Sequence, residues 1–223
     1  MQIHFNYPAE GFGVREEIMH AHRSSWRTLA SASGFWTAQQ RIEIAEQARA
    51  ARSQRSELSF NRDYPASELS PAALEAARTI AADAKKINRA WAQQQTEAIG
   101  LAAYVELAAI VASVAAIDAF AEALGRPHEV LPQPNNETVD STLNESVADI
   151  GAYLPMQEPW PNPNVSRAYS LVPTANAMFF GNVQVMYTGK DRGFNDLVWD
   201  GPLSRPQAEL LAARVSSVNE CFY

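Results

Sequence analysis

Apolar residues recur at helical spacing along most of the chain. In the last segment, Leu211, Val215, Val218 and Phe222 follow one another at intervals of four, three and four residues. That spacing places them on one stripe of a helix, which we expect to pack against a core. No run of any length alternates apolar and polar residues as a half-buried strand does. The pattern predicts an all-α protein with helices over 14–33, 37–53, 72–86, 88–98, 101–124 and 174–187, and another after Ser204.

Residues that cap helices stand at several of these boundaries. A serine or threonine followed three residues later by glutamine is the capping-box pattern, and proline suits the first turn of a helix. A glycine favours the left-handed conformation that ends many helices, and a proline soon after it cannot continue the helix. These signals come from Thr37 with Gln40, Ser70 with Pro71, Ser204 with Gln207, and Gly125 with Pro127.

The segment 101–121 is apolar and about long enough to cross a bilayer, but it is rich in alanine and contains Glu106 and Asp118. These features favour the central helix of a bundle over a membrane span. A carboxylate inside an apolar helix needs a partner. Glu106 therefore has two interpretations: a residue of a functional pocket, or a carboxylate at a helix–helix boundary that an arginine or water satisfies.

Residues 126–166 contain seven prolines among many asparagines and serines. This composition predicts a long irregular connector. It divides the chain into an N-terminal helical half over 1–125, the connector over 126–166, and a C-terminal half over 167–223.

Composition narrows the class of protein. With 223 residues and 47% apolar content the chain can bury a substantial core. The net charge of −7 and the scattered lysines and arginines argue against a nucleic-acid partner. The first residues lack the pattern of a secretory signal, and the single cysteine fits a reducing compartment. We expect a cytoplasmic protein without a membrane partner.

We expect no metal site and no cofactor. His20 and His22 are two residues apart, so on a helix they do not share a face. Four aromatic residues are interpreted as core packing rather than as a cofactor pocket. They are Trp26, Phe35, Trp36 and Trp91.

Glu209 precedes Cys221 by twelve residues, and the sequence ends at Tyr223. The stretch 203–223 resembles the active-site segment of the alkylhydroperoxidase D (AhpD)-like and carboxymuconolactone decarboxylase-like superfamily. In that superfamily a glutamate precedes the first cysteine of a Cys-x-x-Cys motif by twelve residues, and a histidine follows the second cysteine. Here the second position of the motif would be residue 224.

The resemblance extends back along the chain. The segments 36–45, 100–107 and 123–127 look like an earlier copy of the same helical unit, and 167–173 is similar to the lead-in of the second copy. Gln54 stands where the first copy would carry a cysteine, so that copy has no thiol. The resemblance implies an AhpD-like helical bundle of two related halves that forms a homo-oligomer.

The resemblance also implies thiol chemistry. A cysteine attacks peroxide as the thiolate, so its pKa must fall from about 8.5 toward neutrality, and a second thiol then resolves the sulfenic acid as a disulfide. Glu209 would accept a proton or orient the histidine. Twelve residues of straight helix span about 18 Å, so we expect a break at 219–220 that brings Cys221 within reach. The implied partners are a hydroperoxide or other small-molecule substrate and a thiol electron donor.

The position of the last residue suggests a hypothesis. A UGA codon differs by one base from a cysteine codon and also encodes selenocysteine, so residue 224 would be selenocysteine at a recoded stop. A nonsense truncation and a deliberately shortened chain are the competing explanations.

Two other functions stay open. One is a cysteine-independent, carboxymuconolactone decarboxylase-like enzyme that acts on a small organic acid through Glu106, Glu209 or Arg214. The other is a non-catalytic helical oligomer that has kept the fold.

Overall fold

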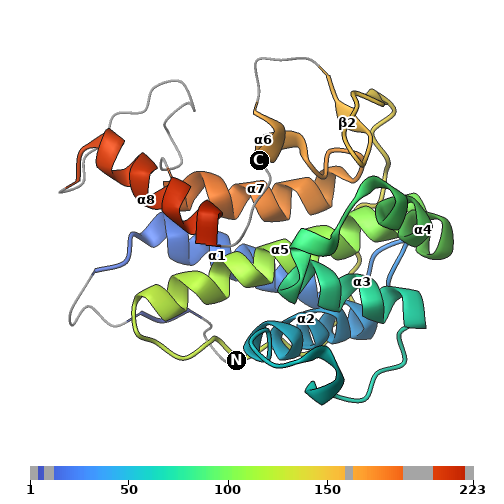
Figure 1. Cartoon of the computed structure of the whole chain (residues 1–223), viewed down its shortest axis with the longest axis horizontal. Coiled ribbons are helices and arrows are strands. Elements are labelled where there is room, and N and C mark those ends of the chain that lie inside the picture. The colour runs from blue at the N-terminus through green and yellow to red at the C-terminus, as the bar shows by residue number, and fades with distance from the viewer. Residues whose placement is uncertain (1–4, 8–12, 159–162, 188–202, 219–223) are drawn as a thin grey trace.

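The computed structural model describes residues 5–7, 13–158, 163–187 and 203–218, and it is built mainly of helices (Figure 1). The all-α prediction is confirmed. One short antiparallel ladder joins β1 (Val147–Ala148) to β2 (Met156–Gln157). The α-helices of the described residues are α1 (Glu16–Ala30), α2 (Ala38–Ser53), α3 (Pro71–Ala82), α4 (Arg89–Ile99), α5 (Leu101–Ala123), α6 (Asn164–Arg167), α7 (Pro173–Tyr187) and α8 (Arg205–Val218).

The capping signals of α2 and α5 work as the sequence predicts. The Thr37 hydroxyl accepts from the Gln40 amide at 3.1 Å, and the Gln40 side chain accepts from the Thr37 amide at 3.0 Å, which completes the capping box of α2. Gly125 follows α5 with φ of 65°, the left-handed conformation that glycine adopts without strain. Gly100, with φ of 95°, both ends α4 and begins α5.

Two predicted helices are shorter than expected. The helix predicted over 14–33 ends at Ala30, because the amide of Ala32 bonds to the Glu137 carbonyl at 2.8 Å instead of continuing the helix. The helix predicted over 72–86 ends at Ala82. A separate 3-10 turn, η2 (Ala84–Lys86), follows it, and the Asp83 carboxylate between the two accepts a hydrogen bond from Arg62 at 2.8 Å.

α5 is the central helix of the bundle. It packs against α2 and α3 and also against α7, which in turn packs against α1 (Figure 1). Val105, Leu107 and Ile110 are fully buried, which explains why this helix is apolar on all sides. α5 is long and apolar enough to cross a membrane, but 67% of its most apolar window is buried inside the bundle.

The predicted aromatic packing is also present. Trp26 and Trp36 are buried in the main core, and Phe35 and Trp91 are partly buried against it. The indole nitrogens of Trp26 and Trp36 donate to the carbonyls of Val130 and Ala103, at 2.8 and 3.0 Å. The apolar rings therefore fill the core while their polar atoms stay hydrogen-bonded.

The segment after α5 is irregular but is tied to the helices. The Asn135 amide donates to the Ala30 carbonyl, and the Val139 amide donates to the Ala32 carbonyl, both at 2.8 Å. The Gly34 amide donates to the Ser141 hydroxyl at 2.6 Å. We call residues 135–141 the strap, because they hold the loop between α1 and α2.

The apolar stripe of α8 does not pack against the core, so that expectation was wrong. Leu211, Val215 and Val218 are 57%, 60% and 63% exposed. α8 has few contacts with the other helices, and a hydrogen bond from Tyr187 of α7 to Glu209 attaches its first half. Phe222, the last residue of the stripe, lies outside the described residues.

We predict that Ala76→Leu destabilises the protein. Ala76 is fully buried on α3, the helix that packs against both α2 and α5. Three additional carbon atoms have no room there and should lower the free energy of unfolding by about 1–3 kcal/mol in urea denaturation. Ala213→Leu, at an exposed position of α8, is the control and should change the free energy of unfolding little. Equal stability of the two variants would contradict this packing.

Candidate functional site

Of the two predicted catalytic residues, the structure describes one. Cys221 and the predicted break at 219–220 lie outside the described residues. Glu209 lies in the first half of α8, with its side chain exposed. The hydroxyl of Tyr187, the last residue of α7, donates to Glu209 Oε1 at 2.6 Å. Glu209 is therefore an accessible carboxylate that a phenol orients.

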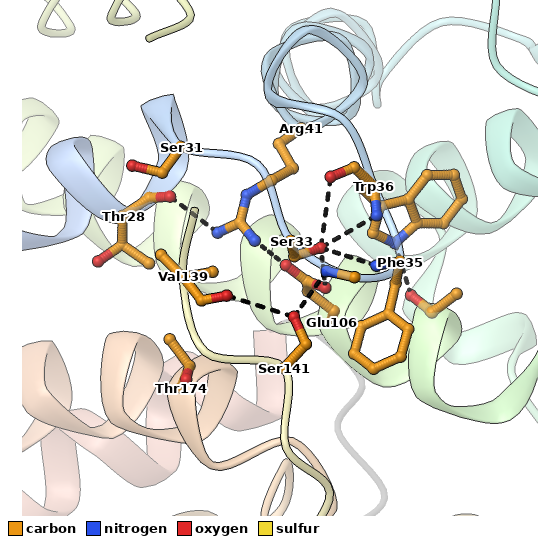
Figure 2. Close-up of polar contacts among 12 residues, drawn as sticks. Thr28, Ser31, Ser33, Phe35, Trp36, Arg41, Glu106, Val139, Ser141 and Thr174 are labelled. Atoms are coloured by element: carbon orange, nitrogen blue, oxygen red, sulfur yellow. Dashed lines mark hydrogen bonds and ion pairs between the residues drawn. The ribbon is translucent and has the colours of Figure 1, made fainter. Parts of the chain in front are cut away.

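Glu106 is in a different environment. Its side chain is 3% exposed, and Oε1 forms an ion pair with Nη1 of Arg41, which is 2% exposed. Oε2 accepts a hydrogen bond from the Ser33 hydroxyl at 2.8 Å (Figure 2). Arg41 Nη2 donates to the Thr28 carbonyl at 2.9 Å. Burial lowers the pKa of Arg41 to about 10, so the guanidinium still carries its charge at neutral pH.

The Ser33 hydroxyl links this pair to the loop between α1 and α2. Besides donating to Glu106, it accepts from the amides of Phe35 and Trp36 at 3.1 and 3.0 Å (Figure 2). Both oxygens of Glu106 are thus engaged by protein groups in the interior. Of its two interpretations, the structure supports a carboxylate at a helix–helix boundary that an arginine satisfies.

The sequence analysis did not single out Arg41. A signal was present, because Arg41 shares the buried face of α2 with Ala38, Ala45 and Ala48 at helical spacings of three, four and seven residues. A charged residue on such a face predicts a buried counter-charge. The sequence could not show which acid provides it.

The second acid of α5 is also paired. Asp118 is 1% exposed, and its carboxylate accepts from Arg49 Nε at 2.8 Å and from Arg49 Nη2 at 2.6 Å. This two-bond geometry is the strongest that arginine and carboxylate form. Arginines of α2 therefore neutralise both buried acids of α5, Glu106 and Asp118.

The two histidines of the His-x-His pattern face different surroundings, as their spacing predicts. His20 is exposed and lines a groove of about 560 Å³ between α1 and α7. His22 is fully buried and packs edge-on against Phe5 and Phe120. Its Nδ1 lies 3.4 Å from the Tyr7 hydroxyl. In the part of the chain that the structure describes, no group of three or more metal-binding side chains comes together.

A larger groove, of about 890 Å³, lies between the C-terminal ends of α2 and α3 and the second half of α8. Its lining includes Arg214, Val215 and Val218 of α8. The structure therefore places Arg214, one of the residues considered for an organic-acid substrate, on the wall of a groove. Glu209 and Glu106 are not among the residues that line it.

Comparison with protein-family models, curated proteins and solved structures gives no match for this chain. The AhpD-like resemblance stays a prediction that rests on the residues quoted for it.

We predict that the buried ion pair is essential for stability. Glu106→Ala leaves the Arg41 guanidinium in the core without its counter-charge and should lower the free energy of unfolding by about 3–5 kcal/mol. Lys86→Ala, which removes an exposed lysine from its ion pair with Asp83, is the control and should cost less than about 1 kcal/mol. Denaturant titration measures both changes.

A double variant separates the missing charge from the lost packing. Arg41→Met combined with Glu106→Leu removes both charges and keeps apolar volume, so it should be more stable than Glu106→Ala alone. A loss below about 1 kcal/mol for Glu106→Ala would contradict the buried pair.

We also predict that His22 makes stability depend on pH. Burial lowers its pKa from 6.5 to about 4. Between these values the unfolded chain binds a proton that the folded protein does not, so the free energy of unfolding falls by up to about 3 kcal/mol as pH drops. His22→Leu should reduce this decline, measured by urea titrations from pH 7 to 4. His20→Leu, at an exposed position, is the control. If the free energy of unfolding falls equally with pH in wild type and in His22→Leu, His22 is not the cause of the decline.

Proposed function

We propose that this protein reduces hydroperoxides through a thiol pair, or a thiol–selenol pair, formed by Cys221 and a residue at position 224. Glu209 is the proton acceptor of the pair. A dithiol donor returns the pair to its reduced form. The proposal builds on the twelve-residue spacing of Glu209 and Cys221, which resembles the AhpD-like motif.

The observation that carries the proposal is the contrast between the two glutamates considered for catalysis. Glu106 is sealed in the core, with both oxygens bound to Arg41 and Ser33. Glu209 is exposed on α8 and hydrogen-bonded by Tyr187. A proton acceptor has to reach the reacting groups directly or through one water molecule. Glu209 meets this requirement for accessibility and Glu106 does not.

The chemistry balances with these groups. Glu209 accepts the proton of the Cys221 thiol, directly or through a relay, and the thiolate attacks the terminal peroxide oxygen. The O–O bond breaks, the alcohol leaves with a proton, and Cys221 becomes a sulfenic acid. The thiol or selenol at 224 displaces water from it and forms the disulfide or selenenylsulfide. A dithiol then reduces this bond and is oxidised to its own disulfide.

A second candidate is the cysteine-independent enzyme that acts on a small organic acid. Arg214 favours it, because this arginine lines the large groove and could bind a carboxylate. With Glu106 in the core, Glu209 and Arg214 are the residues left for this chemistry. The exposed stripe of Leu211, Val215 and Val218 would suit the proposed homo-oligomer, either of an enzyme or of a non-catalytic assembly.

We predict that Cys221→Ser abolishes hydroperoxide reduction by the natively expressed protein. Glu209→Gln keeps the shape of the side chain but cannot accept a proton, so it should lower the rate by about 100-fold or more. The assay follows loss of tert-butyl hydroperoxide with dithiothreitol as the donor. Glu97→Gln, at an exposed position of α4, is the matched control and should act like wild type.

Turnover that survives Cys221→Ser would refute the thiol mechanism and favour the organic-acid enzyme. If Glu209→Gln reduces hydroperoxide as fast as wild type does, Glu209 is not the proton acceptor. Assembly without turnover in any of these proteins would favour the non-catalytic oligomer.

A further inference from the structure

The large groove gathers positive charge in a protein whose net charge is −7. Four basic side chains line it, and one acid, Asp83, lies among them. They come from separate elements: the end of α2, the 3-10 turn η2 and α8. The four are Arg52, Arg55, Lys85 and Arg214.

Asp83 does not neutralise this groove, because other cations already bind it. Its carboxylate lies 2.8 Å from Arg62 Nη1 and 3.2 Å from Lys86 Nζ. The hydrogen bond from Arg62 lowers the pKa of Asp83, so the acid stays ionised and engaged. Arg62 and Lys86, which balance its charge, are not among the four basic residues that line the groove.

Two of the four basic groups are available for a ligand. Arg52 is occupied, since Nη2 pairs with Glu122 at 3.0 Å and Nη1 donates to the Ala115 carbonyl at 2.9 Å. The guanidinium groups of Arg55 and Arg214 have no hydrogen-bond or ion-pair partner among the described residues. Both side chains are exposed, so their charges are open to solvent in the groove.

The rest of the lining is small and apolar, which leaves room beside the charges. The volume of about 890 Å³ is within the range of small-molecule sites. An apolar group of a ligand could pack against these walls while its anion reaches the arginines. The walls include Ala81, Ala82, Ala119, Val215 and Val218.

We infer that this groove binds a phosphate monoester with an apolar body. Each guanidinium offers a fork of two N–H donors. A phosphate monoester carries a charge close to −2 and three terminal oxygens, so it can accept both forks and neutralise both arginines. A single carboxylate has one charge and two oxygens and satisfies one fork. This site goes beyond the proposed function and does not depend on it, because binding here needs neither Cys221 nor Glu209.

Phenyl phosphate tests the inference by isothermal titration calorimetry on the full chain. A ligand of this size should bind with a Kd of about 1 mM or tighter. Arg55→Gln and Arg214→Gln should each weaken binding by about tenfold or more, since each removes charge-assisted hydrogen bonds. Arg27→Gln, at an exposed position of α1, is the matched control and should bind as wild type does. Thermal unfolding of each variant shows that the fold is intact.

Two other probes test the chemical class. Inorganic phosphate should bind more weakly than phenyl phosphate, with the same dependence on Arg55 and Arg214, because it lacks the apolar body. Benzoate should bind more weakly still. Three results would overturn the inference: no binding of phenyl phosphate, binding by the double variant Arg55→Gln with Arg214→Gln that equals wild type, or benzoate bound as tightly as phenyl phosphate. Failure of hydroperoxide reduction would leave these results unaffected, so the two proposals are tested separately.

Discussion

The ion pair between Arg41 and Glu106 is the interaction on which the rest of the bundle depends. Two charges inside a helical core are tolerated only when each meets the other with good geometry and further hydrogen bonds. Here the Ser33 hydroxyl and the Thr28 carbonyl provide those bonds. The pair therefore joins α2 to α5 and anchors the loop that follows α1. The strap, residues 135–141, closes over that loop with its own backbone hydrogen bonds.

This arrangement divides the polar residues of the protein by task. Inside, Arg41 and Arg49 of α2 form ion pairs with Glu106 and Asp118 of α5, and these pairs hold the two helices together. Outside, Glu209 and Arg214 lie on α8, where the side chains stay exposed. Groups that bind or transform a ligand need to be accessible, while charged groups that stabilise a core need to be paired. In the described part of the chain, these paired charges therefore lie in the core and the accessible ones lie on the surface.

α8 connects the two proposals. Its first half carries Glu209, the proposed proton acceptor, and its second half forms one wall of the basic groove. The helix also presents apolar residues to solvent rather than to the core. A helix with few intramolecular contacts is free to serve ligands and partners, at little cost to the stability of the bundle.

The sequence by itself determined the helices and most of their ends, because capping boxes, glycines and prolines act over a few residues of backbone. It also showed that Glu106 stands in an apolar helix, where a carboxylate needs a partner, and that Glu209 precedes Cys221 by twelve residues. Only the tertiary structure decided which arginine pairs with Glu106, that α1 ends early where the strap bonds to it, and that α8 exposes its apolar stripe. These outcomes depend on contacts between residues far apart in the chain, and local spacing carries no information about which distant groups will meet.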